Sequence, residues 1–552
     1  MVDLHVHSTK SDGTYTPTEL VDYAMEKGLS AFALTDHDCV DGLDEAISYA
    51  ESLRAAGKNA PEVIPAIEFS TEYEGHDVHI VGLYINYKCE AFEKYLKHFV
   101  DTRELRNRQM CEKFTAAGIP MDYDELVAES QQSAVITRAH IAQYLLKKGY
   151  VNSTKEAFDR YIGDGKPYHV PREKVDPQLA IKLVLEADGI PVFAHPMLYP
   201  GSKSKIDEIV GMLKEVGLCA IEGIYSTYTT ADERFVRELA DKYHLLLSGG
   251  SDFHGANKVG IDLGVGYGKL YIHDSILENI KKLRKNVLFT DMDGTLLLKD
   301  STVSADMKDA LDRAVAAGHR LVLTSGRPLP SIRERIVKLG FNYPDTYIIA
   351  FGGALIYDLE AGKVIHSYKV PQVAIRGIAE LCKEAGIYIQ GYTDEEIILT
   401  AATEETDYYR QRVNMPYREV PDLADYLVDG SSKLQIIHLT DHDKLEALRA
   451  KIVAQYGEYV DTFFSSPRYL EILPKGVSKG VAVKFMTSYL SVPVSHTFAA
   501  GDEDNDISML KIAGHGVAMA NASEQVKAAA DIITVNDNNH DGLIEILNKY
   551  FN

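Results

Sequence analysis

Residues 286–296, just past the middle of the chain, constrain its fold more than any other stretch. Four largely apolar residues, 287–290, predict a buried strand, and Asp291, Asp293 and Gly294 follow at its carboxyl end. Carboxylates two positions apart on a strand share a face, and the glycine lets the chain turn so that both can converge on one cation and one phosphate. The segment therefore predicts an active site at the end of a strand.

Three segments farther along the chain add polar and charged groups. They contain Ser325 after an apolar run, Lys479 in a glycine-flanked turn, and the acidic stretch with Asp502, Asn505 and Asp506. In this order the segments resemble the motifs of the haloacid dehalogenase superfamily of phosphatases, and residues 516–522 resemble its Cof-type branch. The resemblance covers the chain from about residue 286 to its end. It implies a Rossmann-like, doubly wound α/β domain with an inserted α/β cap.

The resemblance assigns a role to each motif residue by its position. Asp291 would attack phosphorus and become an aspartyl phosphate, and Asp293 would protonate the leaving oxygen and later activate water. Ser325 would donate a hydrogen bond to the transferring phosphoryl group, and Lys479 would balance its charge. The implied activity is that of a phosphatase, with a phosphomutase as the alternative because it begins with the same aspartyl phosphate.

The same resemblance implies a magnesium site. Asp502, helped by Asp506 and with Asn505 orienting the loop, would hold magnesium beside Asp291. A cluster this acidic would repel itself without a divalent ion. The implied metal ligands are Asp291, Asp293, Asp502 and Asp506, and the implied substrate contacts are Ser325, Gly326 and Asn505.

The segment at about residues 368–470 interrupts the doubly wound pattern and is expected to form the cap. Members of the branch usually carry asparagine where this chain has Gly352, so one substrate contact of the relatives is expected to be absent. Cap residues select the substrate. Sugar phosphates, nucleotides and cofactor phosphates all remain open.

The first half of the chain alternates predicted strands and helices, with polar groups near the strand ends. His5 and His7 lie on one face of the first strand, and Asp12 follows. Histidines and carboxylates recur along this half at His37, Glu68, His79, His195, Asp252 and His254. Functional groups in this arrangement predict a (β/α) barrel with its site at the carboxyl-terminal mouth.

These residues in this order resemble the polymerase and histidinol phosphatase family, usually called PHP. The resemblance spans about residues 1–285, no expected ligand is missing, and it implies a distorted TIM-like barrel with a trinuclear metal cluster. The first ion would be held by His5, His7, Glu68 and Asp252, the second by Glu68, His79 and His195, and the third by Asp12, His37 and His254. Glu68 can bridge because a carboxylate can bind two cations and an imidazole cannot.

Mixed nitrogen and oxygen ligands suit manganese, zinc or iron, and the sequence does not choose among them. Closely spaced metals can clamp the attacking and leaving oxygens of a phosphoester. The resemblance therefore implies hydrolysis by a metal-activated water with no covalent intermediate. Histidinol-phosphate phosphatase and single-strand exonuclease are the alternative activities.

A largely helical insertion is predicted at about residues 88–188. Arg138 and His140 within it, and the later residues 165–170, look like those of PHP members that act on nucleoside monophosphates and 3',5'-bisphosphates. Arg138 is a candidate fork for a substrate phosphate, and a helix-surface arginine is the alternative.

The composition bounds the remaining functions. A formal net charge of -23 over 552 residues argues against broad binding to long nucleic acids or anionic membranes. The five cysteines are scattered with no paired spacing, as in reduced proteins. Residues 1–8 carry a histidine pair where a signal peptide needs an apolar run, so a cytoplasmic location is expected. The sequence does not indicate an oligomeric state.

We therefore predict a bifunctional phosphoesterase with domains at residues 1–285 and 286–552. The first would hydrolyse small nucleotide phosphates with a trinuclear cluster, and the second would use magnesium and an aspartyl phosphate. A domain that only binds a nucleotide and regulates its neighbour is the alternative from another functional class. Intact Asp291 and Asp293 argue against it, because a binding module needs neither a nucleophile nor an acid.

Overall fold

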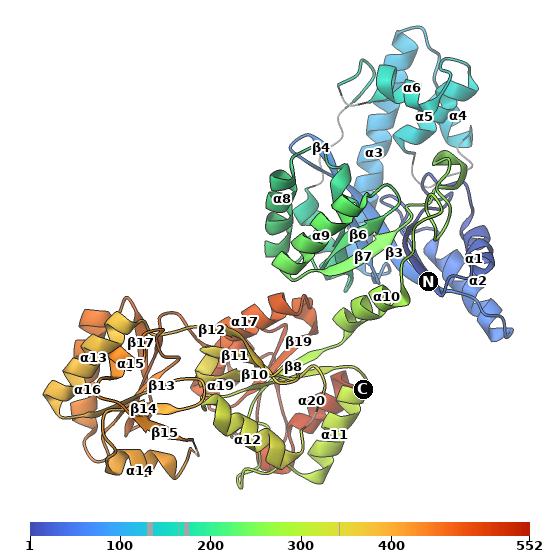
Figure 1. Cartoon of the computed structure of the whole chain (residues 1–552). Coiled ribbons are helices and arrows are strands. Elements are labelled where there is room, and N and C mark those ends of the chain that lie inside the picture. The colour runs from blue at the N-terminus through green and yellow to red at the C-terminus, as the bar shows by residue number, and fades with distance from the viewer. Residues whose placement is uncertain (130–135, 164, 171–175, 342, 414) are drawn as a thin grey trace. The chain divides into compact units, whose positions relative to one another are not determined.

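A computed structural model describes residues 1–129, 136–163, 165–170, 176–341, 343–413 and 415–552. The chain divides into two compact units (Figure 1). Unit 1 comprises Met1–Leu283 with Leu490–Pro493, and unit 2 comprises Arg284–Tyr489 with Val494–Asn552. Both units combine sheets with helices, which confirms the predicted α/β class.

Unit 1 is built on a seven-stranded sheet whose strands follow one another in chain order. The strands are β1 (Val2–Val6), β2 (Ala31–Leu34), β3 (Glu62–Tyr73), β4 (His76–Leu83), β5 (Ile190–Phe193), β6 (Ala220–Tyr225) and β7 (Leu246–Gly250). The end of β1 meets the residues after β7, because the His7 amide donates to the Phe253 carbonyl at 3.0 Å and the Asp252 amide donates to the His5 carbonyl at 2.9 Å. The sheet is therefore a nearly closed, distorted barrel, as predicted.

The distortion comes from β4, which runs antiparallel to both β3 and β5. A two-residue turn joins β3 to β4, and both Glu74 and Gly75 adopt positive φ, as a tight hairpin turn requires. No helix separates these strands, so the strict strand and helix alternation fails here. The hairpin places Glu68 and His79 on one face of the sheet, since Glu68 lies opposite Val81 and His79 opposite Ser70.

Helices cover this sheet and also form a separate bundle. Those that pack in its cores are α1 (Pro17–Glu26), α2 (Leu43–Ala55), α7 (Pro177–Glu186), α8 (Lys203–Glu215) and α9 (Thr230–Tyr243), while α10 (Asp274–Lys281) follows β7. The bundle consists of α3 (Glu90–Ala116), α4 (Tyr123–Glu129), α5 (Arg138–Lys147) and α6 (Thr154–Ala157). Figure 1 shows α4, α5 and α6 grouped at one end of α3, where they share an apolar core of their own.

Unit 2 is built on an eight-stranded sheet in the order β12-β11-β10-β9-β8-β19-β20-β21. These strands are β8 (Val287–Asp291), β9 (Arg320–Thr324), β10 (Tyr347–Ala350), β11 (Leu355–Asp358), β12 (Lys363–Ser367), β19 (Thr497–Gly501), β20 (His515–Ala518) and β21 (Ile532–Ile533). Outside the cap, the longer helices of unit 2 are α11 (Ala305–Ala316), α12 (Leu329–Leu339), α17 (Lys479–Tyr489) and α20 (Leu543–Tyr550). Strand β8 is central and parallel to β9 and β19, so the connections leave it in opposite directions at a topological switch point.

The cap is a second sheet in unit 2, in the order β15-β14-β13-β16-β18-β17. Its strands are β13 (Tyr388–Tyr392), β14 (Ile397–Leu399), β15 (Tyr417–Glu419), β16 (Leu434–Ile437), β17 (Val460–Ser466) and β18 (Tyr469–Pro474). Its helices are α13 (Gln372–Ala385), α14 (Glu404–Arg410), α15 (Leu423–Tyr426) and α16 (His442–Tyr456). One side of the sheet packs on α13 and α16 in a core of its own, and the other contributes to the core shared with the eight-stranded sheet.

Candidate metal centres

The nine predicted ligands of unit 1 converge in one cluster, although seven different segments carry them. Their atoms form four overlapping groups within 4.8 Å: His7, Asp12, His37 and His254; His5, Glu68 and His195; His5, His7 and Asp252; and His37, Glu68 and His79. Most of these side chains are buried. A cluster of this size requires the barrel to bring together residues that lie up to 249 positions apart in the chain, from His5 to His254.

Glu68 lies at the centre of this cluster. Its Oε1 atom is 2.9 Å from Nδ1 of His79 and 3.0 Å from Nε2 of His195. Its Oε2 atom is 3.2 Å from Nε2 of His5, 3.3 Å from Nε2 of His7 and 3.2 Å from Nδ1 of His37. One buried carboxylate thus faces five imidazoles, which is the geometry that a bridging ligand needs.

Asp252 and Asp12 form the second acidic part of the cluster. Oδ1 of Asp252 is 3.4 Å from Nε2 of His7 and 3.3 Å from Nδ1 of His254. Nε2 of His254 is in turn 3.2 Å from Oδ1 of Asp12. The other Asp252 oxygen accepts a hydrogen bond from the Tyr225 hydroxyl at 2.6 Å. Each of these carboxylates therefore has an oxygen directed at the imidazoles.

The electrostatics of the cluster favour cations. Burial lowers the pKa of His7, but the nearby Asp252 and Glu68 carboxylates outweigh burial and raise this pKa to about 9. Burial dominates at His37 and lowers its pKa to about 3. Four buried atoms, His5 Nε2, both ring nitrogens of His7 and Asp12 Oδ1, have no hydrogen-bond partner within the described part of the chain. Because buried polar atoms normally have partners, this set of nitrogen and oxygen donors fits divalent metal ions.

Two of the predicted ligands have a backbone conformation that residues other than glycine rarely adopt. His195 has φ 30° and Asp252 has φ 57°, both in the left-handed region. Such conformations cost about 1–3 kcal/mol each and persist where the surroundings hold them. The His195 amide donates to Glu222 Oε2 at 2.7 Å, and the Asp252 amide is held by the His5 carbonyl. The strain therefore coincides with two of the predicted ligands.

Glu222 is a site residue that our sequence analysis missed. It lies in β6, is only 2% exposed, and accepts a hydrogen bond from Nδ1 of His5 at 3.2 Å as well as the His195 amide. One carboxylate thus orients two predicted ligands, as outer partners of metal-binding histidines do. A carboxylate inside the apolar run 220–225 was the signal that could have revealed it.

Lys258 also contacts the cluster without having been predicted. Its ammonium group forms an ion pair with Asp252 on the oxygen that Tyr225 also contacts. The lysine side chain is 37% exposed, so it connects a predicted ligand to solvent.

The predicted substrate contacts Arg138 and His140 lie at the start of α5. Thr137 caps this helix and its amide donates to Nδ1 of His140 at 2.9 Å. His140 is buried near Asp12, whose charge opposes the lowering of the His140 pKa by burial. Arg138 is farther out and pairs with Asp77 at 3.4 Å. The helix therefore places His140 where the charge of the predicted ligand Asp12 acts on it, whereas Arg138 pairs with a carboxylate on β4.

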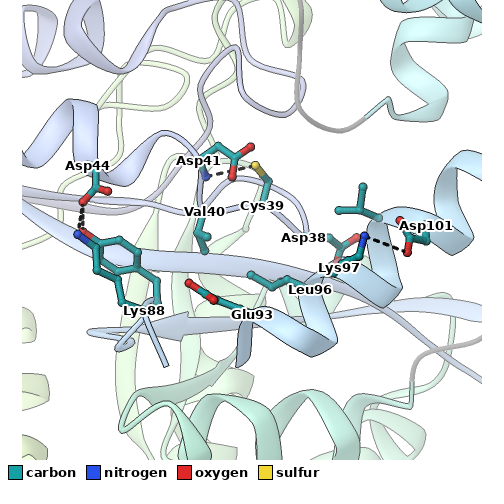
Figure 2. A pocket seen from close by; sticks show the side chains of 12 residues that line it. Asp38, Cys39, Val40, Asp41, Asp44, Lys88, Glu93, Leu96, Lys97 and Asp101 are labelled. Carbon is teal, nitrogen blue, oxygen red and sulfur yellow. Dashed lines mark hydrogen bonds and ion pairs between the residues drawn. The ribbon is translucent and has the colours of Figure 1, made fainter. Parts of the chain in front are cut away.

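A cavity of about 610 Å³ lies between the loop after β2 and helix α3 (Figure 2). Tyr87, Lys88 and Asp44 line this cavity, and the first two side chains both contact Asp44. Asp38, which follows the predicted ligand His37, also lines the cavity and forms a buried ion pair with Arg103 of α3. The cavity is thus adjacent in sequence and in structure to a predicted ligand.

Unit 2 holds a different cluster around Lys479. This lysine is almost fully buried and forms an ion pair with Asp291, at the end of β8, and one of 2.5 Å with Asp506 Oδ1. Oxygens of Asp291, Asp502 and Asp506 lie within 4.8 Å of one another. The Lys479 ammonium group therefore lies among three carboxylates that follow the ends of β8 and β19.

Asp502 is held against the turn that follows Asp291. The Thr295 hydroxyl donates to Oδ1 of Asp502 at 2.7 Å, and the side-chain amide of Asn521 donates to its Oδ2 at 3.3 Å. Gly294 has φ 87°, and an added Cβ there would collide with the Asp502 carboxylate. Glycine is therefore required at this position both for its backbone conformation and for the close approach.

Burial and repulsion from neighbouring carboxylates raise the pKa values of Asp291 and Asp502. The pKa of Asp291 rises to about 7, mainly through burial and against the attraction of Lys479. The pKa of Asp502 rises to about 6 through burial and the charges of Asp506 and Glu503. Because the carboxylates are not balanced by one lysine, this oxygen-rich set fits a divalent cation such as magnesium.

The side chain of Asp293 lies apart from this group. Its carboxylate accepts from Arg327 Nε at 2.6 Å and from Nη2 at 3.1 Å, and it is 45% exposed. Ser325 is buried after β9, where its hydroxyl accepts a hydrogen bond from the Arg327 amide at 3.2 Å. Gly326 follows it, and Asn505 is exposed between the acidic residues. Most of the predicted groups thus lie near the strand ends, whereas Asp293 forms an ion pair with Arg327.

The part of the chain that the structure describes contains no helix both long enough and apolar enough to cross a bilayer.

Comparisons with known proteins match the two halves separately. The family model for the PHP domain matches residues 3–167, and the model for haloacid dehalogenase-like hydrolases matches residues 288–547. A 5'-3' exoribonuclease of Haemophilus influenzae is 36% identical over 252 residues, 46% of this chain and 89% of that protein. A 3',5'-nucleoside bisphosphate phosphatase of Chromobacterium violaceum is 34% identical over 263 residues, 48% of this chain and 90% of that protein. Among solved structures, a haloacid dehalogenase-like hydrolase from Bacteroides thetaiotaomicron is 28% identical, with 48% of this chain and all of that one covered and a TM-score of 0.45.

Proposed function

The chain belongs to the PHP family through its first half and to the haloacid dehalogenase-like hydrolases through its second, and we propose that each half carries its own phosphoesterase site. It is a hydrolase that acts on phosphate esters. Both families use divalent metals in general. We further propose which residues hold these metals and which substrates each half uses, and that the two domains meet near residue 285.

In unit 1, the nine clustered residues would hold up to three divalent ions, with Glu68 bridging. The observation that carries this proposal is the Glu68 carboxylate, which faces five imidazoles at 2.9–3.3 Å. The ions would activate water and neutralise charge on the phosphate. The protein's own part is to hold the imidazoles in a fixed orientation, through Glu222, which contacts the His5 ring and the His195 amide.

The substrate of unit 1 is proposed to be a small nucleotide, such as a nucleoside monophosphate or 3',5'-bisphosphate. The relative from Chromobacterium violaceum, named as a 3',5'-nucleoside bisphosphate phosphatase, supports this. The exoribonuclease relative favours a second candidate, removal of nucleotides from the 5' end of RNA.

One assay separates these candidates. The Asp291→Asn variant, which should silence unit 2, is supplied with manganese and either a nucleoside 3',5'-bisphosphate or a 5'-phosphorylated RNA oligonucleotide. Faster release of inorganic phosphate from the bisphosphate supports the small-nucleotide phosphatase. Faster release of mononucleotides from the oligonucleotide supports the exoribonuclease.

In unit 2, Asp291 is proposed to attack phosphorus and form an aspartyl phosphate while the alcohol leaves. Lys479 would neutralise charge on the phosphoryl oxygens, and Ser325 would donate a hydrogen bond to one of them. Asp291, Asp502 and Asp506 would hold magnesium, which would screen the nucleophile from the phosphate charge. The ion pair between Lys479 and two of these carboxylates is the observation that carries the assignment.

Asp293 is proposed as the acid and base of the same reaction. In its protonated form it would give its proton to the leaving oxygen, and as a carboxylate it would then take a proton from the water that attacks the aspartyl phosphate. Arg327 pairs with this carboxylate and would hold it in place. Asp293→Asn should therefore slow the breakdown of the intermediate, which a burst followed by a slow steady state would reveal.

The two sites would act in sequence if both phosphates of one metabolite are substrates. Their presence in one chain motivates this hypothesis. Asp291→Asn and Asp252→Ala are each assayed on one nucleoside bisphosphate and on a set of unrelated phosphate esters. Loss of different and unrelated substrates in the two variants would refute the coupling.

A further inference from the structure

The loop after strand β7 carries an ammonium group beside the predicted metal ligands of unit 1. Lys258 in this loop forms an ion pair with Oδ2 of Asp252. The other oxygen of that carboxylate, Oδ1, lies 3.4 Å from Nε2 of His7 and 3.3 Å from Nδ1 of His254. The lysine and the imidazoles therefore contact different oxygens of Asp252, so the ion pair leaves the proposed metal-binding oxygen available.

The backbone of this loop is fixed on both sides of Lys258. The side-chain amide of the preceding residue, Asn257, donates to the Asp12 carbonyl at 2.7 Å. Gln143 of α5 donates a hydrogen bond to the Asn257 side chain, so the helical bundle holds the same loop. On the other side, the Ile261 amide donates to the Lys258 carbonyl at 3.2 Å. The fold therefore holds the lysine between the segment that carries Asp12 and the bundle.

The ammonium group of Lys258 is charged and keeps unused donors. Burial acts to lower its pKa, but the charges of Asp252, Glu68 and Asp12 outweigh burial and raise this pKa. An ammonium group has three N–H donors, and Asp252 is the only hydrogen-bond acceptor that the described residues give it. Because the lysine side chain is 37% exposed, a ligand from solvent can reach the remaining donors. The group therefore has the charge, the donors and the access that binding of an anion requires.

The two proposed kinds of substrate for unit 1 differ in their negative charge. A phosphate monoester carries a charge of about −1.5 to −2 at pH 7, whereas each phosphodiester group carries about one negative charge. Attraction to a fixed ammonium group grows with the charge of its partner, so loss of the ammonium group weakens the binding of a monoester more. A lysine beside the cluster therefore favours monoesters over diesters.

We propose that Lys258 is a catalytic residue of unit 1 that binds a non-bridging oxygen of the ester phosphate and gives the site a preference for monoesters. This inference rests on the proposed function of unit 1. A phosphate held at the cluster would lie beside Asp252, within reach of the remaining N–H donors of Lys258. The lysine forms no covalent bond with the substrate and transfers no proton. The alternative is that Lys258 only orients Asp252, as an outer partner of a metal ligand.

The test compares two substrates that share a 5' phosphate and differ at the 3' phosphate. This group is a monoester in a nucleoside 3',5'-bisphosphate and a diester in a 5'-phosphorylated dinucleotide. Both are assayed with saturating manganese in full-length Asp291→Asn, the parent variant, which should silence unit 2. Adding Lys258→Met should lower kcat/KM on the bisphosphate about 10- to 100-fold, the size of one lost hydrogen bond between charged groups. On the dinucleotide the loss should be at least about fivefold smaller.

Three further variants separate charge from positioning. Lys258→Gln keeps a donor for Asp252 but removes the charge, so it should behave like Lys258→Met. Lys258→Arg keeps the charge and should retain the preference for the bisphosphate within about threefold. Lys269→Met removes a lysine at an exposed position of the same connection between β7 and α10, and it should change neither substrate.

Manganese titration measures the role that Lys258 has through Asp252. The affinity of each variant should stay within about threefold of the parent, because the Tyr225 hydroxyl still donates to Oδ2 of Asp252. Melting temperatures verify that each variant is folded. A fall in manganese affinity as large as the fall in activity would overturn the proposal, because Lys258 would then act only through Asp252.

Equal losses on the two substrates, or no loss on either, would also overturn the assignment of Lys258. A substrate that the parent binds without cleaving is compared by its inhibition constant. If Asp291→Asn itself neither cleaves nor binds either substrate, the proposed function of unit 1 is refuted. That outcome is observed before Lys258 is changed, so it is distinct from a failure of the lysine assignment.

Discussion

The two clusters balance buried charge with opposite arrangements of side chains. In unit 1 a single central carboxylate, Glu68, faces five imidazoles. In unit 2 a single ammonium group, Lys479, faces two carboxylates, with Asp502 close by. Imidazoles can be neutral ligands, so several cations can gather without excess negative charge, whereas the oxygen-rich site needs one hard cation and a fixed positive charge.

The difference also separates the chemistry that each cluster can perform. The residues that surround Glu68 are all suited to hold ions, and no side chain among the nine is assigned a covalent step. In unit 2, Asp291 is both a member of the acidic group and the proposed nucleophile. The comparison therefore predicts that one site depends on its metals for the attacking group and the other depends on a side chain.

The largest expected effects come from removing the central residue of each site. Asp291→Asn should reduce the proposed magnesium-dependent phosphatase activity of unit 2 at least about 10³-fold and leave the proposed nucleotide phosphatase activity of unit 1 unchanged. Glu68→Gln should do the reverse. Steady-state kinetics on both substrate classes check this, and melting temperatures verify that each variant is folded. If either variant lost both activities while folded, the separation of the sites would be wrong.

Glu222→Ala tests the residue that orients two predicted ligands of unit 1. It removes the carboxylate that orients His5 and the His195 backbone, so the affinity of unit 1 for metal should fall about 10- to 100-fold. Titration of the metal-free protein with manganese measures this directly. Glu238→Ala, at an exposed position of α9, is the matched control and should leave the affinity unchanged. Unaltered affinity in Glu222→Ala would show that β6 has no part in metal binding.

The stability of metal-free unit 2 should depend on pH through Asp291. Its folded pKa of about 7 exceeds the ordinary value of 3.8, so the folded state binds the extra proton between these values. The free energy of unfolding must then fall as pH rises from about 4 to 7, by about 1.4 kcal/mol for each unit of pKa difference. Melting temperatures of the wild type and Asp291→Asn without divalent ions test this. Parallel curves for the two proteins would contradict it, and magnesium should flatten the wild-type curve.

Thr295→Val should have the smallest effect. It removes one hydrogen bond to Asp502, worth about 1 kcal/mol, so the apparent magnesium affinity should fall about fivefold. The activity of unit 1 serves as the internal control. A loss as large as that of Asp291→Asn would mean that Thr295 has a direct catalytic part.

The sequence predicted motifs better than their surroundings. The strand ends that carry Asp291 and Asp252 follow from local patterns, because apolar runs and glycine turns fix where a strand stops. Glu222 was missed because it lies within an apolar strand and its contacts come from residues 27 or more positions away. The antiparallel course of β4 was also not predicted, although Glu74 and Gly75 gave a local signal for a hairpin.

Long-range pairing limits what can be predicted in the cap. Gln435 and Glu471 are opposite each other only because of the register of β16 against β18, and no local pattern specifies that register. The contact of Arg327 with Asp293 likewise joins two strand-end loops. The chemical groups could therefore be found from the sequence, but not their partners.

The most direct test of two independent chemistries is to look for the covalent intermediate. The protein is mixed with a phosphate ester labelled at phosphorus, quenched in acid within the first turnover and digested, and the labelled peptide is located by mass spectrometry. We predict an acid-stable, hydroxylamine-sensitive label on Asp291 in the wild type and in Glu68→Gln, and none in Asp291→Asn. A label within residues 1–283, or hydrolysis by unit 2 with no labelled Asp291 under single-turnover conditions, would contradict the assignment.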